Sequence, residues 1–283
     1  MKKYVDLHTH STVSDGSLTP VQIVQRAKKY DLSAISITDH DAIDGTDDAL
    51  AEAQTLNIDF VPGIEISTAW CQGRMHILGY FIDHKAQSIE QLLKRLQQAR
   101  KDRVFKICAR LKDMGMEVPP ELVFKIAGGA NSVGRPHIAN AMVKLGFIPR
   151  LQTAFDKYLA YGKSAYIPRW APTPQEAIDT IHRAGGIASI AHCAVTEGCM
   201  DNIFDVISMG IDAVEVYYPF HKPHQIELLK KIARDHNLAI SGGSDCHGIV
   251  RGEPLLGIYK VPICVYESLL ECKSKFSSAK TGG

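Results

Sequence analysis

The chain opens on Val5-Asp6-Leu7-His8-Thr9-His10, and its other polar motifs are arranged around this stretch. Apolar residues alternate with polar ones here, which is the pattern of a strand with one buried face. Side chains two residues apart on a strand point to the same side, so His8 and His10 are expected to project together. Two imidazoles held in this way suit one divalent metal ion. Asp15 follows in a Ser-Asp-Gly-Ser turn and adds a carboxylate at the end of the strand.

Apolar strands alternate with amphipathic helices along most of the chain. Thr19-Pro20-Val21-Gln22 and Thr173-Pro174-Gln175-Glu176 are capping boxes with proline at the first helical position, and each predicts the start of a helix. After the first strand, further strands are expected over residues 34–40, 60–66, 75–81, 187–192, 213–217 and 238–244. This alternation is typical of parallel βα units, and about seven strands favour a closed barrel over an open sheet.

A helical stretch interrupts the alternation. One long polar helix is expected from Ser88 to Met114, followed by shorter ones over 121–127, 136–145 and 151–159. We therefore predict an α/β fold, a distorted (β/α)7 barrel with an inserted small helical subdomain. The expected parts are a first barrel part (1–95), the helical insertion (96–165), a second barrel part (166–276) and a flexible tail (277–283).

The composition is that of a soluble globular protein, with 45% hydrophobic and 22% charged residues. A formal net charge of +1 gives no long-range attraction to polyanions, which argues against long duplex nucleic acid as a partner. The seven cysteines are scattered, no apolar run could span a bilayer, and the N-terminus lacks a signal region. These features predict a reduced, cytoplasmic protein without membrane attachment, and a monomer is favoured.

Histidines and acids recur on the expected strands or at their carboxyl ends, where barrels of parallel strands build their active sites. Asp245-Cys246-His247 repeats the spacing of the first strand. Several carboxylates buried together would be costly without cations to offset their charge. Nine mixed nitrogen and oxygen ligands exceed the need of one ion, so two or three metals are predicted. The candidate ligands are His8, His10, Asp15, His40, Glu65, His76, His192, Asp245 and His247.

Five motifs in this chain resemble those of the polymerase-and-histidinol-phosphatase (PHP) superfamily, and they occur in the family order. They are Asp6–His10, Thr38–Asp41, Pro62–Glu65, Ala191-His192 and Gly243–His247. The resemblance extends over essentially the whole chain and implies a distorted (β/α)7 barrel with a trinuclear metal site. The insertion that carries Gly134-Arg135-Pro136-His137 resembles the bacterial branch that hydrolyses nucleoside 3′,5′-bisphosphates, a branch that also includes a 5′→3′ exoribonuclease of short RNA ends.

The resemblance also implies how the ligands divide among three ions. His8, His10, Glu65 and Asp245 would hold one ion. Glu65 would bridge to a second, held with His76 and His192. Asp15, His40 and His247 would hold the third. Within this set the expected catalytic residues are Asp15, His40, Glu65 and His192. Mn²⁺ is favoured by the resemblance alone, since Zn²⁺, Fe²⁺ and Mg²⁺ also accept such ligands.

One residue departs from the family pattern. Cys193 follows His192, where the family often has proline, so the shape of that loop is in doubt. A thiol at this position could bind a metal or be oxidised. Cys246, between Asp245 and His247, is expected to point away from the site and to pack.

Further residues are candidates for binding the substrate. Arg135 and Arg169 would bind phosphate, because a guanidinium group matches two phosphate oxygens. His221 could protonate the leaving alkoxide or contact a second phosphate, and His224 and Tyr217 could contact the substrate. For the arginines and the two histidines the alternative is a solvated surface residue, and for Tyr217 it is core packing.

Three secondary hypotheses concern residues near these motifs. Asp6 and Asp39 could orient metal-bound imidazoles through hydrogen bonds. Tyr218 could stack on a base of the substrate, with core packing as the alternative. The basic residues of the long helix, Arg100 and Arg103 among them, are interpreted as a solvated helix face, since acids and glutamines interrupt them.

We therefore expect a metal-dependent phosphoric monoester hydrolase. It would remove the 3′-phosphate of a nucleoside 3′,5′-bisphosphate, such as adenosine 3′,5′-bisphosphate, and leave the 5′-monophosphate. A 5′→3′ exonuclease activity on short 5′-phosphorylated RNA is a second expectation. Histidinol-phosphate phosphatase is disfavoured because of the insertion with Arg135. A metal-dependent amidohydrolase would not need paired arginines, and a non-catalytic PHP module would be expected to lose ligands.

Overall fold

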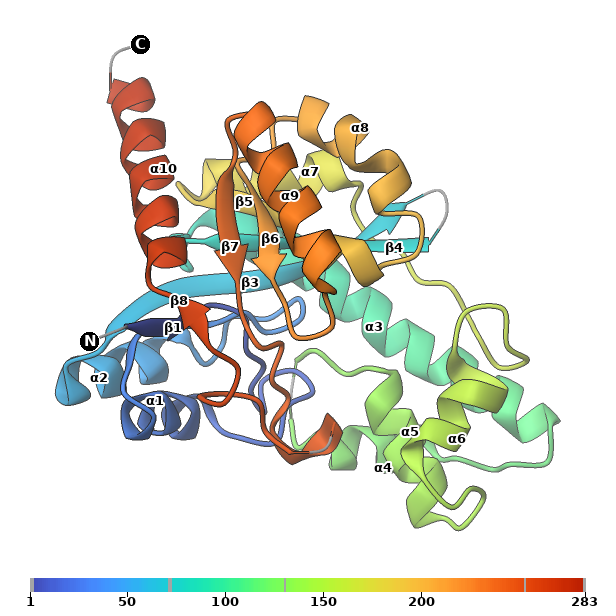
Figure 1. Cartoon of the computed structure of the whole chain (residues 1–283). Coiled ribbons are helices and arrows are strands. Elements are labelled where there is room, and N and C mark those ends of the chain that lie inside the picture. The colour runs from blue at the N-terminus through green and yellow to red at the C-terminus, as the bar shows by residue number, and fades with distance from the viewer. Residues whose placement is uncertain (1–2, 71–72, 130, 252, 282–283) are drawn as a thin grey trace. The chain divides into compact units, whose positions relative to one another are not determined.

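The computed structural model describes residues 3–70, 73–129, 131–251 and 253–281 (Figure 1). It divides into two compact units. The first consists of Met1–Leu92 and Pro172–Gly283, and the second of Leu93–Ala171. In the described part of the chain, no helix is long and apolar enough to cross a membrane.

A sheet with the strand order β7-β6-β5-β4-β3-β2-β1-β8 forms the centre of the first unit. Its eight described strands are β1 (Tyr4–Asp6), β2 (Leu32–Ile37), β3 (Asp59–Trp70), β4 (Gly73–Tyr80), β5 (Ile187–Ile190), β6 (Ala213–Tyr217), β7 (Ala239–Gly242) and β8 (Val261–Pro262). The pairs β1–β2, β2–β3, β5–β6 and β6–β7 are parallel, as predicted.

The expectation of parallel βα units throughout is wrong for β4. This strand runs antiparallel to both β3 and β5. Only two residues separate β3 from β4, whereas a crossover between parallel strands needs a dozen or more. The connection therefore has to be a hairpin. The short strand β8 is a second addition, and it pairs antiparallel with β1.

The sheet curves so that the segment after β1 forms backbone hydrogen bonds with the end of β7 and the segment that follows it. The Leu7 amide donates to the Gly242 carbonyl (3.2 Å), and the Asp245 amide donates to the His8 carbonyl (2.8 Å). The His10 amide donates in turn to the carbonyl of Cys246 (2.9 Å). The result is the nearly closed, distorted α/β barrel that the resemblance implied. Closure brings the first and last motifs of the chain together.

Helices surround this sheet. They are α1 (Pro20–Lys29), α2 (Thr46–Leu56), α7 (Pro174–Arg183), α8 (Ile203–Ser208), α9 (Pro223–Asp235) and α10 (Cys264–Thr281). The predicted capping boxes are present: Thr19 and Gln22 exchange hydrogen bonds at the start of α1, and Thr173 and Glu176 do so at the start of α7. The tail expected from Ser277 is instead helical as far as Thr281, where α10 ends.

The second unit is helical, as predicted. It contains α3 (Gln87–Asp113) from Leu93 onward, α4 (Pro120–Ile126), α5 (Arg135–Lys144), α6 (Leu151–Ala154) and a π-helical turn (Phe155–Leu159). Its helices bury their own apolar cluster, which includes Val104, Ile107, Leu111, Ile138 and Met142. A separate core of this kind is what an inserted subdomain needs to be compact by itself.

Candidate metal centre

All nine predicted metal ligands lie in the first unit. His8 and His10 follow β1 in the extended segment that closes the barrel, and their rings are 5.2 Å apart. His40 follows β2 and forms an isolated bridge with Glu65 on β3. His76 lies within the antiparallel strand β4 rather than at a carboxyl end. The remaining ligands follow β5 and β7: His192, Asp245 and His247.

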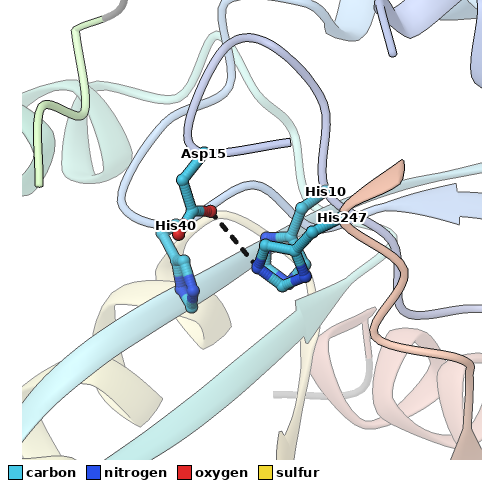
Figure 2. Close-up of side chains that lie close together, drawn as sticks. All are labelled: His10, Asp15, His40 and His247. Carbon is cyan, nitrogen blue, oxygen red and sulfur yellow. Dashed lines mark ion pairs between the residues drawn. The ribbon is translucent and has the colours of Figure 1, made fainter. Parts of the chain in front are cut away.

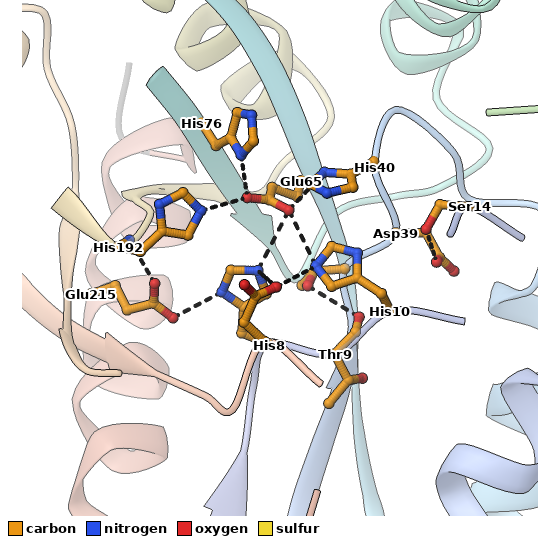
Figure 3. Close-up of polar contacts among 12 residues, drawn as sticks. His8, Thr9, His10, Ser14, Asp39, His40, Glu65, His76, His192 and Glu215 are labelled. Carbon is orange, nitrogen blue, oxygen red and sulfur yellow. Dashed lines mark hydrogen bonds and ion pairs between the residues drawn. The ribbon is translucent and has the colours of Figure 1, made fainter. Parts of the chain in front are cut away.

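Glu65 is the centre of the cluster, and it is fully buried (Figure 3). Its Oε2 atom lies 2.8 Å from His40 Nδ1 and 3.2 Å from His10 Nε2. Its Oε1 atom lies 2.7 Å from His76 Nδ1 and 3.0 Å from His192 Nε2. His8 Nε2 is a third imidazole atom near Oε2, at 3.5 Å. One carboxylate therefore faces five imidazoles, three on Oε2 and two on Oε1, which is the arrangement of a ligand that can bridge two ions.

Asp245 approaches the first two histidines. Its Oδ1 atom is 3.0 Å from His10 Nε2 and 3.5 Å from His8 Nε2. Together with Glu65, each of these residues offers one donor atom, and the four atoms lie within 4.8 Å of one another. This group has the same members as the first ion site that the resemblance implied.

A second group of four surrounds Asp15 (Figure 2). Asp15 Oδ1 is 3.3 Å from His247 Nε2, and the His247 ring stacks on His10 at 4.1 Å. His10, Asp15, His40 and His247 again offer donor atoms within 4.8 Å of one another. The structure thus adds His10 to the three residues implied for this ion.

The third group consists of His40, Glu65 and His76. It contains His40 in the place where the resemblance implied His192. His192 still points at the cluster, since its Nε2 atom hydrogen-bonds Glu65 Oε1.

Several of the buried nitrogen and oxygen atoms that could bind a metal have no hydrogen-bond partner in the described part of the chain. Five of them have no aligned hydrogen-bond partner among the described residues, although charged neighbours lie within 2.8–3.5 Å. They are His8 Nε2, His10 Nε2, His40 Nδ1, Glu65 Oε2 and His247 Nε2. Buried polar atoms normally have such partners. Imidazole and carboxylate atoms that converge while several of them lack a hydrogen-bond partner are what a site for divalent ions requires.

The electrostatics of the cluster favour ionised carboxylates. Burial by itself raises the pKa of Glu65, but the charges of histidines, His40 foremost and His8 among them, hold that pKa well below its usual range. Burial also acts on Asp15 and Asp245, and there too histidines, His247 foremost among them, hold the pKa well below the ordinary value.

His76 shows the opposite behaviour. Burial lowers its pKa to about 4, against the partial compensation from Glu65. The imidazole is therefore neutral at pH 7, and a neutral imidazole is the form that binds a metal.

Asp39 supports the loop that carries Asp15. Its carboxylate accepts hydrogen bonds from the Ser11 amide (2.7 Å), the Ser11 hydroxyl (2.6 Å) and the Ser14 hydroxyl (2.5 Å). Asp6 and Asp39 were expected to orient imidazoles, but their carboxylates instead accept hydrogen bonds from backbone amides and, for Asp39, from hydroxyl groups. Asp6 accepts from the Ser244 amide at 2.8 Å.

Glu215 is a residue of the centre that the sequence analysis missed. It lies on β6, is fully buried, and contacts both His8 Nδ1 (2.9 Å) and the His192 amide (2.6 Å) (Figure 3). A signal for it exists in the sequence, because it is an acid inside the otherwise apolar run Ala213–Tyr217.

The candidate substrate residues of the first unit lie in different environments. His221 is buried, its Nδ1–H donates to the Val216 carbonyl (3.0 Å), and its Nε2 has no hydrogen-bond partner among the described residues. His224 is exposed near the start of α9. Tyr217 packs against the barrel core, with Lys230 Nζ 5.3 Å from its ring centre.

The adjacent Tyr218 was expected only as a stacking partner for a base or as a core residue. Its hydroxyl donates to Asp245 Oδ2 (3.0 Å), and its ring lies 5.1 Å from His221 and 5.4 Å from His192. It therefore connects His221 to the metal cluster.

Arg135 and Arg169 line one pocket within the second unit. Arg135 Nη1 donates to the Leu159 carbonyl (2.9 Å), and Arg169 Nη1 donates to the Trp170 carbonyl (3.1 Å). Arg100 and Arg103 line the same pocket. The interpretation of these two as part of a solvated helix face is wrong, because α3 turns them toward the pocket and Arg103 is only 7% exposed.

Both questioned cysteines are packing residues. Cys193 is buried, and its hydrogen bond with Cys199 together with burial raises the pKa of its thiol far above the ordinary value. Thiolate formation at Cys193 is therefore disfavoured, although a thiolate is what metal binding or oxidation would require. Cys246 packs with the apolar residues of α1 and α2, as predicted.

Comparison with known proteins agrees with this geometry. The family model described as PHP domain matches residues 6–251. A 5′-3′ exoribonuclease of Haemophilus influenzae is 35% identical over 252 residues, which cover 87% of this chain and 91% of that protein. A 3′,5′-nucleoside bisphosphate phosphatase of Chromobacterium violaceum is 31% identical over 251 residues, or 86% and 87% of the two chains. The crystal structure of a candidate metal-dependent phosphoesterase from Bifidobacterium adolescentis superposes with a TM-score of 0.85 at 28% identity, over 95% and 96% of the chains.

Proposed function

Since this chain belongs to the PHP domain family and is a hydrolase, we propose that it removes the 3′-phosphate of nucleoside 3′,5′-bisphosphates. The products would be the nucleoside 5′-monophosphate and phosphate. The single observation that carries the proposal is the buried cluster around Glu65, in which imidazole and carboxylate atoms converge and five of these atoms have no aligned hydrogen-bond partner among the described residues. The names of the relatives, a bisphosphate phosphatase among them, support the choice of substrate.

The cluster would hold three divalent ions, with Mn²⁺ as the proposed metal. When bound, such ions neutralise the charge of a phosphate ester and lower the pKa of a water molecule. Glu65 would bridge ions through its two oxygens, since three imidazoles lie near Oε2 and two near Oε1. Asp15, His40 and His247 would hold one of these ions. His76 and His192, which both lie near Glu65 Oε1, would hold another.

His221 is the proposed general acid. The carbonyl of Val216 can only accept a hydrogen bond, so Nδ1 of His221 carries a hydrogen. The second nitrogen, Nε2, is then the atom that can hold and release the catalytic proton. In the protonated imidazolium, Nε2–H would give its proton to the leaving 3′-oxygen of the nucleoside. His224 and Tyr217 remain weaker proposals for substrate contact, the first because it is exposed and the second because it packs on the core.

Arg135 and Arg169 are proposed to bind a phosphate group of the substrate. Four arginines line their pocket, and a planar guanidinium can bond two phosphate oxygens at once. Arg135 uses Nη1 on the Leu159 carbonyl, which fixes the direction in which the guanidinium group points.

Phosphate release from adenosine 3′,5′-bisphosphate by the Mn²⁺-loaded protein tests the proposal. The wild type is compared with Arg135→Ala and with Arg150→Ala, an exposed arginine of the same unit that serves as the matched control. We expect release of phosphate with AMP as the second product, and a KM at least about tenfold higher for Arg135→Ala only. No turnover of the bisphosphate by the metal-loaded wild type would refute the assignment.

A 5′→3′ exoribonuclease activity is the second candidate, favoured by the 35% identity to the Haemophilus influenzae enzyme. A 5′-phosphorylated dinucleotide and histidinol phosphate are assayed beside the bisphosphate. Turnover of the dinucleotide alone would make the protein chiefly a nuclease. Turnover of histidinol phosphate alone would assign it to amino-acid metabolism instead.

A further inference from the structure

We propose that Glu215 is a positioning residue that fixes two metal ligands, His8 and His192, with one carboxylate. The inference rests on the metal centre proposed above. Glu215 lies in the middle of β6 with no solvent exposure, and each of its two oxygens serves one of the two ligands.

The contact with His8 determines which nitrogen of its imidazole can bind a metal. Glu215 Oε1 lies 2.9 Å from His8 Nδ1. A carboxylate accepts hydrogen bonds, so Nδ1 carries the hydrogen, and in the neutral imidazole the lone pair is then on Nε2. Nε2 is the atom that lies 3.5 Å from both Glu65 Oε2 and Asp245 Oδ1, on the side of the cluster. Glu215 thus directs the lone pair of His8 at the ion.

The contact with His192 acts on the backbone. His192 lies two residues after the end of β5 and has φ +30° and ψ 41°, a left-handed conformation that costs free energy for a residue with a side chain. Glu215 Oε2 accepts the amide hydrogen of this residue at 2.6 Å. The bond holds the strained turn in the conformation that directs His192 Nε2 at Glu65 Oε1.

The two contacts together couple ligands from distant segments. His8 follows the first strand and His192 the fifth, and they address different oxygens of Glu65. The Glu215 carboxylate contacts both residues and so sets the distance between His8 and His192. A buried carboxylate is costly unless cations or hydrogen bonds compensate it; two hydrogen bonds contribute to that compensation, and divalent ions bound nearby would add to it.

The same pair of strands offers a matched control. Asp212, just before β6, also accepts one backbone amide and one imidazole: the Ala188 amide at 2.7 Å and His182 Nε2 at 2.7 Å. Its histidine belongs to α7 and is not a candidate ligand. Asp212→Asn therefore removes the same kind of interaction from the β5–β6 pair without touching the metal cluster.

The experiment measures bound metal and Mn²⁺ affinity for the wild type, Glu215→Gln and Asp212→Asn, after loading and dialysis. Loss of a supporting carboxylate of this kind lowers metal affinity roughly 10- to 100-fold. We expect that loss for Glu215→Gln and wild-type affinity for Asp212→Asn. Unchanged Mn²⁺ affinity in Glu215→Gln would overturn the proposed role of Glu215 but leave the metal centre standing. A wild type that binds no ions would overturn both proposals.

A second measurement needs no variant and so does not depend on how well Glu215→Gln folds. Imidazole nitrogen NMR of the Zn²⁺-loaded wild type reports the tautomer of His8. Hydrogen on Nδ1 and coordination through Nε2 are expected. Hydrogen on Nε2 would contradict the proposal.

Discussion

Glu65 shows how much of the site depends on one residue. It is fully buried on β3, and both of its oxygens face imidazoles from other segments of the chain. Burial and charge act on it in opposite directions, and the histidines prevail, so the carboxylate stays ionised. A group in this environment can hold cations at neutral pH.

Asp6 is also a buried acid, but its pKa is raised, whereas that of Glu65 is lowered. Burial raises its pKa from 3.8 to about 7, although hydrogen bonds from Ser244 and His8 lower it in part. The folded state therefore binds this proton more tightly than the unfolded state. The stabilisation is complete below pH 3.8 and is lost as the pH rises to about 7.

We predict that Asp6→Asn removes this pH dependence. Relative to the variant, the wild type should lose free energy of unfolding between pH 4 and 7, by roughly 1.4 kcal/mol per pH unit. Urea unfolding of metal-free wild type and Asp6→Asn at pH 5, 6 and 7 measures the difference. Parallel curves for the two proteins would show that Asp6 does not titrate in this range.

At the scale of the elements, the site depends on how the segments after β1 and β7 meet. Gly243 is the point of closest approach. A Cβ atom on Gly243 would lie 2.3 Å from the backbone nitrogen of His8 and 2.4 Å from His8 Cβ. Neither atom is the end of a flexible side chain, so only a shift of the backbone could relieve the contact. Glycine at this position lets the barrel close with His8 in place.

Gly243→Ala should therefore destabilise the protein by about 3 kcal/mol or more and displace His8. The expected result is a lower thermal midpoint together with fewer bound ions per chain. Gly128→Ala is the control: Gly128 has φ +62°, but a Cβ atom added there would meet nothing within 4 Å, so this variant reports conformational cost alone. Full metal content in Gly243→Ala would show that the closure tolerates a side chain.

At the scale of the whole molecule, the first unit concentrates six histidines and three carboxylates around one buried cluster. These groups come from segments that follow or belong to six strands, so ions bound among them would crosslink the barrel. A ligand that binds only the folded state adds its binding free energy to stability.

Loading with Mn²⁺ should therefore raise the thermal midpoint. At a free concentration 100 times the dissociation constant, one ion contributes about 2.7 kcal/mol. Scanning calorimetry of the protein with EDTA and with increasing Mn²⁺ measures the shift, and NaCl at the same ionic strength controls for screening. A midpoint that does not respond to Mn²⁺ would argue against metal crosslinks in the fold.

Local spacing in the sequence was sufficient for much of this protein. The i, i+2 spacing places His8 beside His10, because the direction of side chains along an extended chain depends only on the backbone. Asp245 and His247 also lie close together, although Asp245 has a left-handed backbone with φ +51°. Helix starts at Thr19 and Thr173 followed from bonds between residues three apart. The alternation of strands and helices, and the interruption by a helical insertion, were readable for the same reason.

Long-range contacts determined the rest. Glu215 bonds a residue 207 positions away, and no local pattern encodes such a partner. The arginine pocket forms only when α3 packs against the start of α5. The antiparallel direction of β4 was not predicted, because only two residues separate β3 from β4 and the sequence shows no clear turn there. Spacing along the chain sets which side chains share a face, whereas packing between distant segments sets which faces meet, and that depends on the sum of many contacts across the fold.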